Sequence, residues 1–152
     1  MTENGFTVAV AESVTSGLIQ NAFSQATDAT KFFQGGITAY NLGQKSRHLN
    51  VEPIHAEDCN CVSNHVSETM AVEVAKNFSA NIGIGITGYA APVEEIGVTE
   101  EFAVVAIFKE SKKLLTKKIE GLKKADPVAQ QEKFTKETLK LLVEALEAKA
   151  KK

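Results

Sequence analysis

Residues 11–17 read Ala11-Glu12-Ser13-Val14-Thr15-Ser16-Gly17, and they join a short apolar run, residues 6–10, to a segment with apolar side chains at helical spacing, residues 18–23. This pattern predicts a strand, a hydroxyl-rich turn and a helix. Free backbone N–H groups at the start of a helix, beside serine and threonine hydroxyls, can hold an anion or a developing oxyanion. Serine and threonine are also preferred helix N-caps, so capping and chemistry are both open interpretations of the turn.

The rest of the chain alternates between strand-like and helix-like patterns. Residues 32–40 are expected to form a turn that enters a short strand, further strands are expected at 81–86, 102–108 and 114–119, and helices at 44–50, after Ser63, and after Asp126-Pro127. Residues 81–86 alternate isoleucine with small residues, which predicts that another element packs closely against a glycine face. There are enough helices to cover both faces of a sheet. We therefore expect an α/β fold, a single three-layer α/β/α domain over residues 1–152 with a mostly parallel mixed sheet of about five strands.

Composition indicates an ordinary globular domain of 152 residues, 43% hydrophobic and 24% charged. The sequence has neither a long apolar run nor a basic and apolar leader at its start, so we expect a cytoplasmic protein with no membrane partner. Residues 109–152 carry a net charge of +6 and residues 1–108 carry −8. The lysines are interleaved with glutamates and have few aromatic neighbours, which favours a solvated face over nucleic-acid binding.

Three predicted strands end in polar turns, at 12–17, 40–45 and 87–92. Ligands of open α/β sheets bind at the carboxyl ends of strands, so we expect these turns to converge. A serine hydroxyl becomes a good nucleophile only when a neighbouring base takes its proton. Lys45 is the candidate base for Ser13, provided that burial lowers the pKa of its amine. The alternative is that Lys45 is an exposed surface lysine.

Four motifs resemble those of one family. Residues 11–17 resemble A-E-S-C-T-G-G, residues 35–41 with Lys45 resemble G-G-V-V-A-Y-S-N-x-x-K, residues 86–92 resemble I-T-G-I-A-G-P, and Val62-Ser63 resembles the start of A-V-S-E. They occur in the order and spacing of the C-terminal domain of the competence/damage-inducible protein CinA, also called the nicotinamide mononucleotide amidase family. The resemblance covers roughly residues 6–146.

The resemblance implies hydrolysis of the carboxamide of nicotinamide mononucleotide to nicotinate mononucleotide and ammonia. In this reading Ser13 is the nucleophile, Lys45 its general base, and Tyr40 orients the lysine or the intermediate. The backbone N–H groups of residues 15–17 would stabilise the oxyanion. The expected substrate-binding residues are Glu12, Thr15, Ser16, Gly17, Gly36, Asn41, Thr87 and Gly88. Neither a cofactor nor a metal is expected, and the partners implied are a small-molecule nucleotide substrate and a second copy in a homodimer.

The chain also departs from the family pattern. Val14 and Ser16 replace a cysteine and a glycine, the loop at residues 93–99 is short and acidic, and Pro127 stands where the family has an arginine. These changes favour an alternative hypothesis, a non-catalytic domain that binds a nucleotide or a protein partner. Geometry can discriminate between the two. A Lys45 nitrogen near the Ser13 oxygen in an open pocket favours an enzyme, whereas a pocket filled by Tyr89 or by the 93–99 loop favours a binding domain.

Two more patterns have competing interpretations. Glu12 either acts as a catalytic acid or stabilises the N-terminus of the following helix with its carboxylate, and the second interpretation is favoured. Four residues of zinc-ligand type occur within eleven positions, His55, Cys59, Cys61 and His65. Their spacing differs from that of the usual zinc knuckle, and cytoplasmic thiols are commonly reduced and buried, so we predict no metal here.

Overall fold

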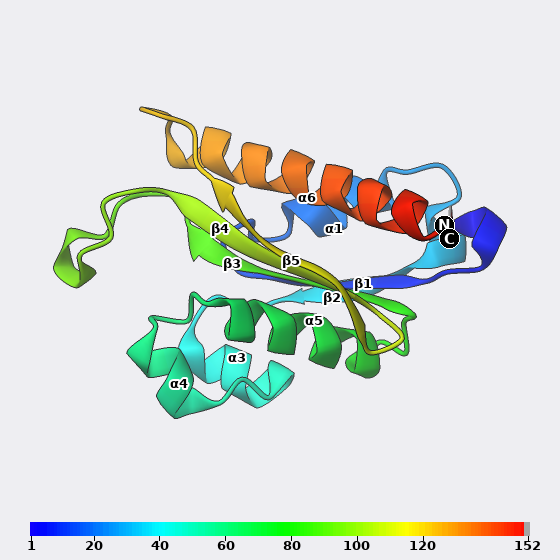
Figure 1. Ribbon diagram of the computed structural model, residues 1–152, viewed down its shortest axis with the longest axis horizontal. Helices are drawn as coiled ribbons and strands as arrows, with labels where there is room; N and C mark the ends of the chain where they lie inside the picture. The colour runs from blue at the N-terminus through cyan, green and yellow to red at the C-terminus, as the bar shows by residue number, and fades with distance from the viewer. Residues whose placement is uncertain (151–152) are drawn as a thin grey trace.

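Five strands form one mixed sheet in the middle of the domain (Figure 1). The computed structural model describes residues 1–150. The sheet order is β2-β1-β3-β4-β5. The strands are β1 Val8–Glu12, β2 Phe33–Thr38, β3 Ile82–Tyr89, β4 Phe102–Lys109 and β5 Lys112–Glu120. Strand β1 pairs in parallel with β2 and β3, whereas β4 pairs antiparallel with both β3 and β5, so four of the five strands run in one direction.

Helices cover both faces of the sheet, which confirms the three-layer α/β/α prediction (Figure 1). The helices are α1 Leu18–Ser24, α2 Ala29–Phe32, α3 Leu42–Leu49, α4 Pro53–Asp58, α5 Asn64–Asn77 and α6 Pro127–Ala150, with short 3₁₀ turns at Thr2–Asn4 and Glu94–Ile96. One apolar core lies between the sheet and α1, α2 and α6, and a second lies between the sheet and α3, α4 and α5. Within residues 1–150 no helix has the length and apolar character that crossing a membrane requires.

The predicted elements are present with small shifts at their ends, and two short helices are additional. Strand β2, Phe33–Thr38, lies within the stretch 32–40 in which a turn and a short strand are expected. Helix α4 begins at Pro53, where the sequence pattern suggested only a break after α3. The side chain of Glu52 caps this helix by accepting hydrogen bonds from the backbone N–H groups of Ile54 and His55. Pro53 stands at the start of α4, where proline is a common helix start signal.

The glycines of β3 allow α5 to approach the sheet closely, as the sequence predicts. A Cβ atom at Gly83 would overlap the backbone carbonyl of Ala71, and one at Gly85 would overlap that of Ser67. Both carbonyls belong to α5. The tight packing of α5 then leaves the neighbouring α3 and α4 on the same side of the sheet (Figure 1).

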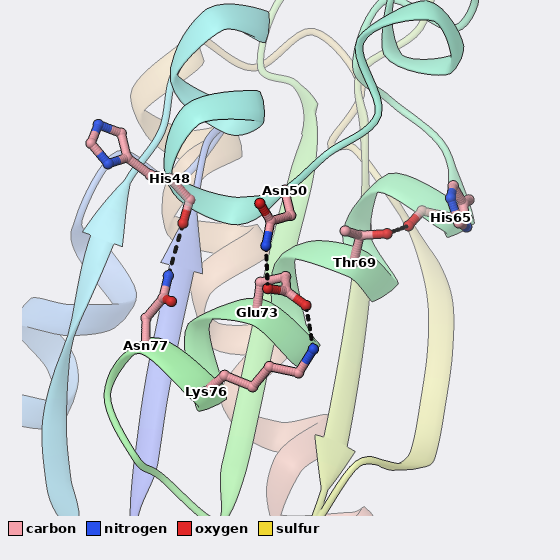
Figure 2. A network of polar contacts seen from close by, with 7 residues as sticks. All are labelled: His48, Asn50, His65, Thr69, Glu73, Lys76 and Asn77. Atoms are coloured by element: carbon pink, nitrogen blue, oxygen red, sulfur yellow. Dashed lines mark hydrogen bonds and ion pairs between the residues drawn. The ribbon is translucent and has the colours of Figure 1, made fainter.

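Polar contacts attach α3 to α5 (Figure 2). The amide of Asn77 donates to the backbone carbonyl of His48 at 2.8 Å, and the amide of Asn50 donates to Glu73 at 2.8 Å. Glu73 also pairs with Lys76. Asn50 is the C-cap residue of α3 and has a left-handed backbone (φ 50°), which asparagine tolerates better than most residues. These contacts position α3, the helix that carries Lys45.

Candidate active site

Ser13 and Lys45 lie in direct contact at the carboxyl ends of β1 and β2. The Lys45 Nζ is 2.9 Å from the Ser13 Oγ and donates to the backbone carbonyl of Ala39 at 2.9 Å. Ser13 directly follows β1, and its backbone N–H donates to the carbonyl of Ile86 in β3. Asn41 begins α3 by accepting from the N–H of Gln44 at 3.0 Å, which turns Lys45 inward on the first turn of the helix.

Lys45 is almost completely buried, with 1% of its surface exposed. Burial lowers the pKa of the Lys45 amine, because the charged form loses its hydration, while the nearby Cys61 thiol opposes this shift. Ser13 is also buried, with 6% exposed. The alternative of a surface lysine is therefore wrong, and burial makes the neutral form of the Lys45 amine easier to reach than in an exposed lysine.

The pair faces an open cavity of about 460 Å³. Its wall includes Tyr40, Thr87, Gly88, Tyr89 and Gln131. Tyr89 and the 93–99 loop contribute to the wall and leave the cavity unfilled, so the geometry meets the criterion that favours an enzyme over a filled binding domain.

Tyr40 lies at the rim of the cavity, with 67% of its surface exposed. The expectation that Tyr40 orients the lysine is not what the contacts show, since within the described residues the Lys45 amine bonds only to Ser13 and to the carbonyl of Ala39. A backbone carbonyl one residue before Tyr40 has that role. Tyr40 is placed instead to contact a bound molecule at the entrance.

Glu12 is fully buried and stabilises the start of α1. Its carboxylate accepts from the Thr15 hydroxyl at 2.6 Å and from the N–H groups of Ile19 and Gln20 at 2.9 and 3.0 Å. The structure thus corrects two expectations. Glu12 is used inside the fold and is not a substrate-binding residue, and the hydroxyls of the turn do not cap α1, whose N-cap is Gly17.

The predicted oxyanion donors are only partly available. The backbone N–H of Ser16 donates to the carbonyl of Ser13 at 3.0 Å, so it is already occupied. Those of Thr15 and Gly17 have no acceptor within residues 1–150, but these two residues, like Ser16, are not among those that line the cavity. Ser16 has a left-handed backbone (φ 48°), which is the conformation that a glycine adopts more easily.

The other predicted binding residues divide into two groups. Gly88 lines the cavity, and Thr87 lines it while its hydroxyl donates to the backbone carbonyl of Cys61 at 2.8 Å. Gly36 and Asn41 are structural. Gly36 packs against the Val10 carbonyl and the Gln20 side chain, and Asn41 caps α3, so neither is among the residues that line the cavity.

Gln131 is a cavity residue that the sequence analysis missed. Its side-chain amide donates to the backbone carbonyl of Val14 at 3.0 Å and connects α6 to the nucleophile turn. These two residues are 117 positions apart, and no motif marks Gln131. Only the packing of α6 beside α1 could have revealed the contact.

The histidine and cysteine cluster does not form a metal centre in the part of the chain that the structure describes, residues 1–150. The imidazole of His55 is 3.0 Å from the Ser63 hydroxyl, which caps α5, and its ring lies edge-on to that of His65. Cys61 instead lines the cavity beside Lys45, where burial raises the pKa of the Cys61 thiol. Cys61 therefore forms part of the wall of the candidate active site.

The model of the CinA C-terminal domain matches residues 1–146. The chain belongs to the CinA C-terminal domain family. Curated relatives are named competence-damage inducible protein. The relative from Natranaerobius thermophilus is 34% identical over 120 residues, which are 78% of this chain and 29% of the relative. That from Streptococcus agalactiae is 35% identical over 88 residues, 58% of this chain and 21% of the relative. The CinA domain described here thus spans less than a third of these relatives.

Solved structures of CinA proteins share the fold. A competence or damage-inducible protein from Enterobacter asburiae has a TM-score of 0.88 at 26% identity, covering 95% of this chain and 90% of that chain. A CinA superfamily protein from Klebsiella pneumoniae has a TM-score of 0.90 at 22% identity, covering 97% and 91%. At 22% identity, the similarity to the Klebsiella pneumoniae protein shows only that the fold is shared.

Proposed function

We propose that this CinA domain is an amidohydrolase that cleaves a carboxamide through Ser13 and Lys45. The observation that carries the proposal is the 2.9 Å contact between the buried Lys45 amine and the Ser13 hydroxyl at the wall of an open cavity. A serine with a lysine base is a known variant of hydrolase chemistry. The family resemblance implies that the carboxamide belongs to nicotinamide mononucleotide, which is the first substrate to assay.

The chemistry follows from the roles of the two side chains. The neutral Lys45 amine takes the proton of the Ser13 hydroxyl as its oxygen attacks the carboxamide carbon. The ammonium of Lys45 then gives that proton to the leaving nitrogen, which departs as ammonia and leaves an ester on Ser13. Water, activated by the same amine, hydrolyses the ester to the carboxylic acid and restores the hydroxyl. The N–H groups of Thr15 and Gly17 are the candidates to stabilise the oxyanion.

The test is ammonia release from nicotinamide mononucleotide by the wild type, Ser13→Ala and Lys45→Ala. We expect turnover by the wild type and a loss of about 10³-fold in each variant. Lys31→Ala removes an exposed lysine that pairs with Asp28, and it is the matched control with unchanged turnover. If both active-site variants kept the wild-type rate, Ser13 and Lys45 would not be the catalytic pair.

A second candidate function is binding without turnover, and the charges beside the cavity favour it. Val93 lines the cavity, and Glu94 and Glu95 follow it directly in an exposed turn, where they repel a phosphate-bearing substrate. A folded wild type that binds carboxamides in calorimetry but releases no ammonia from any of them would support this candidate. A homodimer is part of the main proposal, since the family resemblance implies it, and light scattering tests the dimer. A cytoplasmic location is proposed with it.

A further inference from the structure

We propose that the site prefers a carboxamide substrate without a phosphate group, a neutral or cationic molecule of nucleoside size or smaller. This inference rests on the proposed amidohydrolase function and names the substrate class of the same cavity. It follows from the charges that surround the cavity. A phosphate could be held by a cationic side chain, by a helix N-terminus or by the net charge at the entrance.

The cavity offers no cationic side chain for a phosphate. Among the described residues that line it, Lys45 is the only basic one. Its amine is buried against Ser13 and the Ala39 carbonyl, and burial lowers its pKa, so it is committed to the reaction centre. Phosphate recognition ordinarily uses charge-assisted hydrogen bonds from arginine or lysine. Lys123 and Lys124 are exposed in the segment before α6 and are not among the lining residues.

Two helix N-termini near the cavity, those of α1 and α6, are already supplied with carboxylates, whereas those of α3 and α5, beside the lining residues Tyr40 and Val62, are capped by the neutral side chains of Asn41 and Ser63. Glu12 accepts the N–H groups of Ile19 and Gln20 at the start of α1. At the start of α6, which contributes Pro127 and Gln131 to the cavity wall, Asp126 accepts the N–H of Ala129 at 2.8 Å. A helix N-terminus attracts an anion, but here the chain provides its own anions at both places.

The charged residues that directly follow the lining residue Val93 are acidic, and Lys118, which lies over the ring of Phe102 next to Tyr89, is paired with Glu120. Glu94 and Glu95 lie one and two residues from the lining residue Val93, so their backbones are within roughly 8 Å of the wall. This distance is comparable to the Debye length at physiological ionic strength. Two glutamates at such a distance disfavour a dianion and favour a cation.

The aromatic residues of the wall suit a flat or cationic ring. Tyr89 lines the cavity with its ring packed edge-on to Phe102 at 5.5 Å, and Tyr40 is exposed at the rim. Aromatic faces attract cations and stack with planar rings. A pyridinium carboxamide without a phosphate therefore meets every observed charge and surface of the cavity favourably.

The test compares nicotinamide riboside with nicotinamide mononucleotide, because the two compounds differ only in the phosphate. We expect kcat/KM of the wild type for the riboside to exceed that for the nucleotide by about tenfold at low salt, and added salt to narrow the ratio. The double variant Glu94→Gln and Glu95→Gln should lower the ratio of kcat/KM for the riboside to kcat/KM for the nucleotide about threefold at low salt.

The control variant combines Glu144→Gln and Glu147→Gln. It changes the same charge on exposed residues of α6 about 25 Å or more along the helix from Pro127, and it should leave the ratio unchanged. Equal or higher kcat/KM for the nucleotide would overturn the inference while supporting the amidohydrolase. If neither compound is hydrolysed, the proposed function fails. Calorimetry then measures the binding of both compounds to Ser13→Ala and decides whether the site prefers a ligand without a phosphate. Tighter binding of the riboside supports this preference, whereas tighter binding of the nucleotide, or no binding of either, overturns it.

Discussion

The Gln131 side-chain amide donates a hydrogen bond to the backbone carbonyl of Val14 at 3.0 Å and thereby fixes α6 to the residue that follows the nucleophile. Because a peptide unit is planar, this contact also sets the direction of the Thr15 N–H, one of the candidate oxyanion donors. We therefore predict that Gln131 is a positioning residue, which affects the proposed reaction through the backbone of the turn.

Gln131→Met is expected to lower kcat about tenfold with less than about a twofold change in KM, because the side chain keeps its length but loses the donor that orients the turn. Glu132→Met places the same side chain at the neighbouring exposed position of α6 and should leave both constants unchanged. Steady-state ammonia release measures both variants. A rise in KM alone, with kcat unchanged, would show that Gln131 contacts the substrate and does not position the turn.

The pH dependence of activity should follow Lys45. Since burial lowers the pKa of this amine from 10.5, the neutral base becomes available below that pH, and kcat/KM should rise with pH along a limb whose midpoint lies below 10.5. Lys45→Arg keeps a positive charge that cannot be removed and should reduce kcat/KM about 10³-fold. A wild-type profile that stays flat up to pH 10 would contradict the role of Lys45 as base.

The same buried amine makes stability depend on pH. The folded-state pKa of Lys45 is lower than its unfolded value, so between these two values the unfolded chain binds more protons, and the free energy of unfolding rises with pH in that window. Lys45→Met should lack this rise. Urea unfolding from pH 7 to pH 10 measures it, with Lys76→Met as the control that retains the rise. Parallel curves for wild type and Lys45→Met would mean that Lys45 is not appreciably desolvated.

Glu12 gives a prediction that separates structure from substrate binding. Glu12→Gln replaces one acceptor oxygen by an NH₂ group in a fully buried position that receives three hydrogen bonds. We expect the free energy of unfolding to fall by about 2 kcal/mol, with KM unchanged in the folded fraction. Glu132→Gln is the exposed control. A raised KM with normal stability would instead restore Glu12 as a substrate-binding residue.

The sequence could predict the fold and the Ser13–Lys45 pair because both depend on local signals. Strand periodicity, the caps at Ser63 and Asp126 and the rule that strand ends converge place Ser13 and Lys45 at the same edge of the sheet. The remaining contacts of the site could not be predicted in this way, because they join residues far apart in the sequence or because another nearby side chain could make the same hydrogen bonds. The Gln131–Val14 bond joins distant positions, and Glu12 occupies the helix N-terminus that the hydroxyls of the turn were expected to cap.

The close packing of α5 on β3 supplies the last prediction. Gly85→Ala should destabilise the domain by about 3 kcal/mol, because the new methyl group would overlap the backbone of Ser67 and Ala71 in α5, and a backbone cannot rotate away as a side chain can. Gly43→Ala is the matched control. Gly43 lies inside α3, and its nearest neighbour to a new Cβ is the Asn41 side chain at 3.6 Å.

Alanine at position 43 should therefore leave stability unchanged or raise it by about 0.5–1 kcal/mol through helix propensity. Thermal and urea unfolding compare the two variants with the wild type. If Gly85→Ala were as stable as Gly43→Ala, helix α5 would have room to move away from the sheet. Helix α5 supports α3 through Asn50 and Asn77, and α3 carries Lys45 (Figure 2). The position of the cavity would then be less tightly fixed than the overlap of a Gly85 Cβ with the α5 backbone implies.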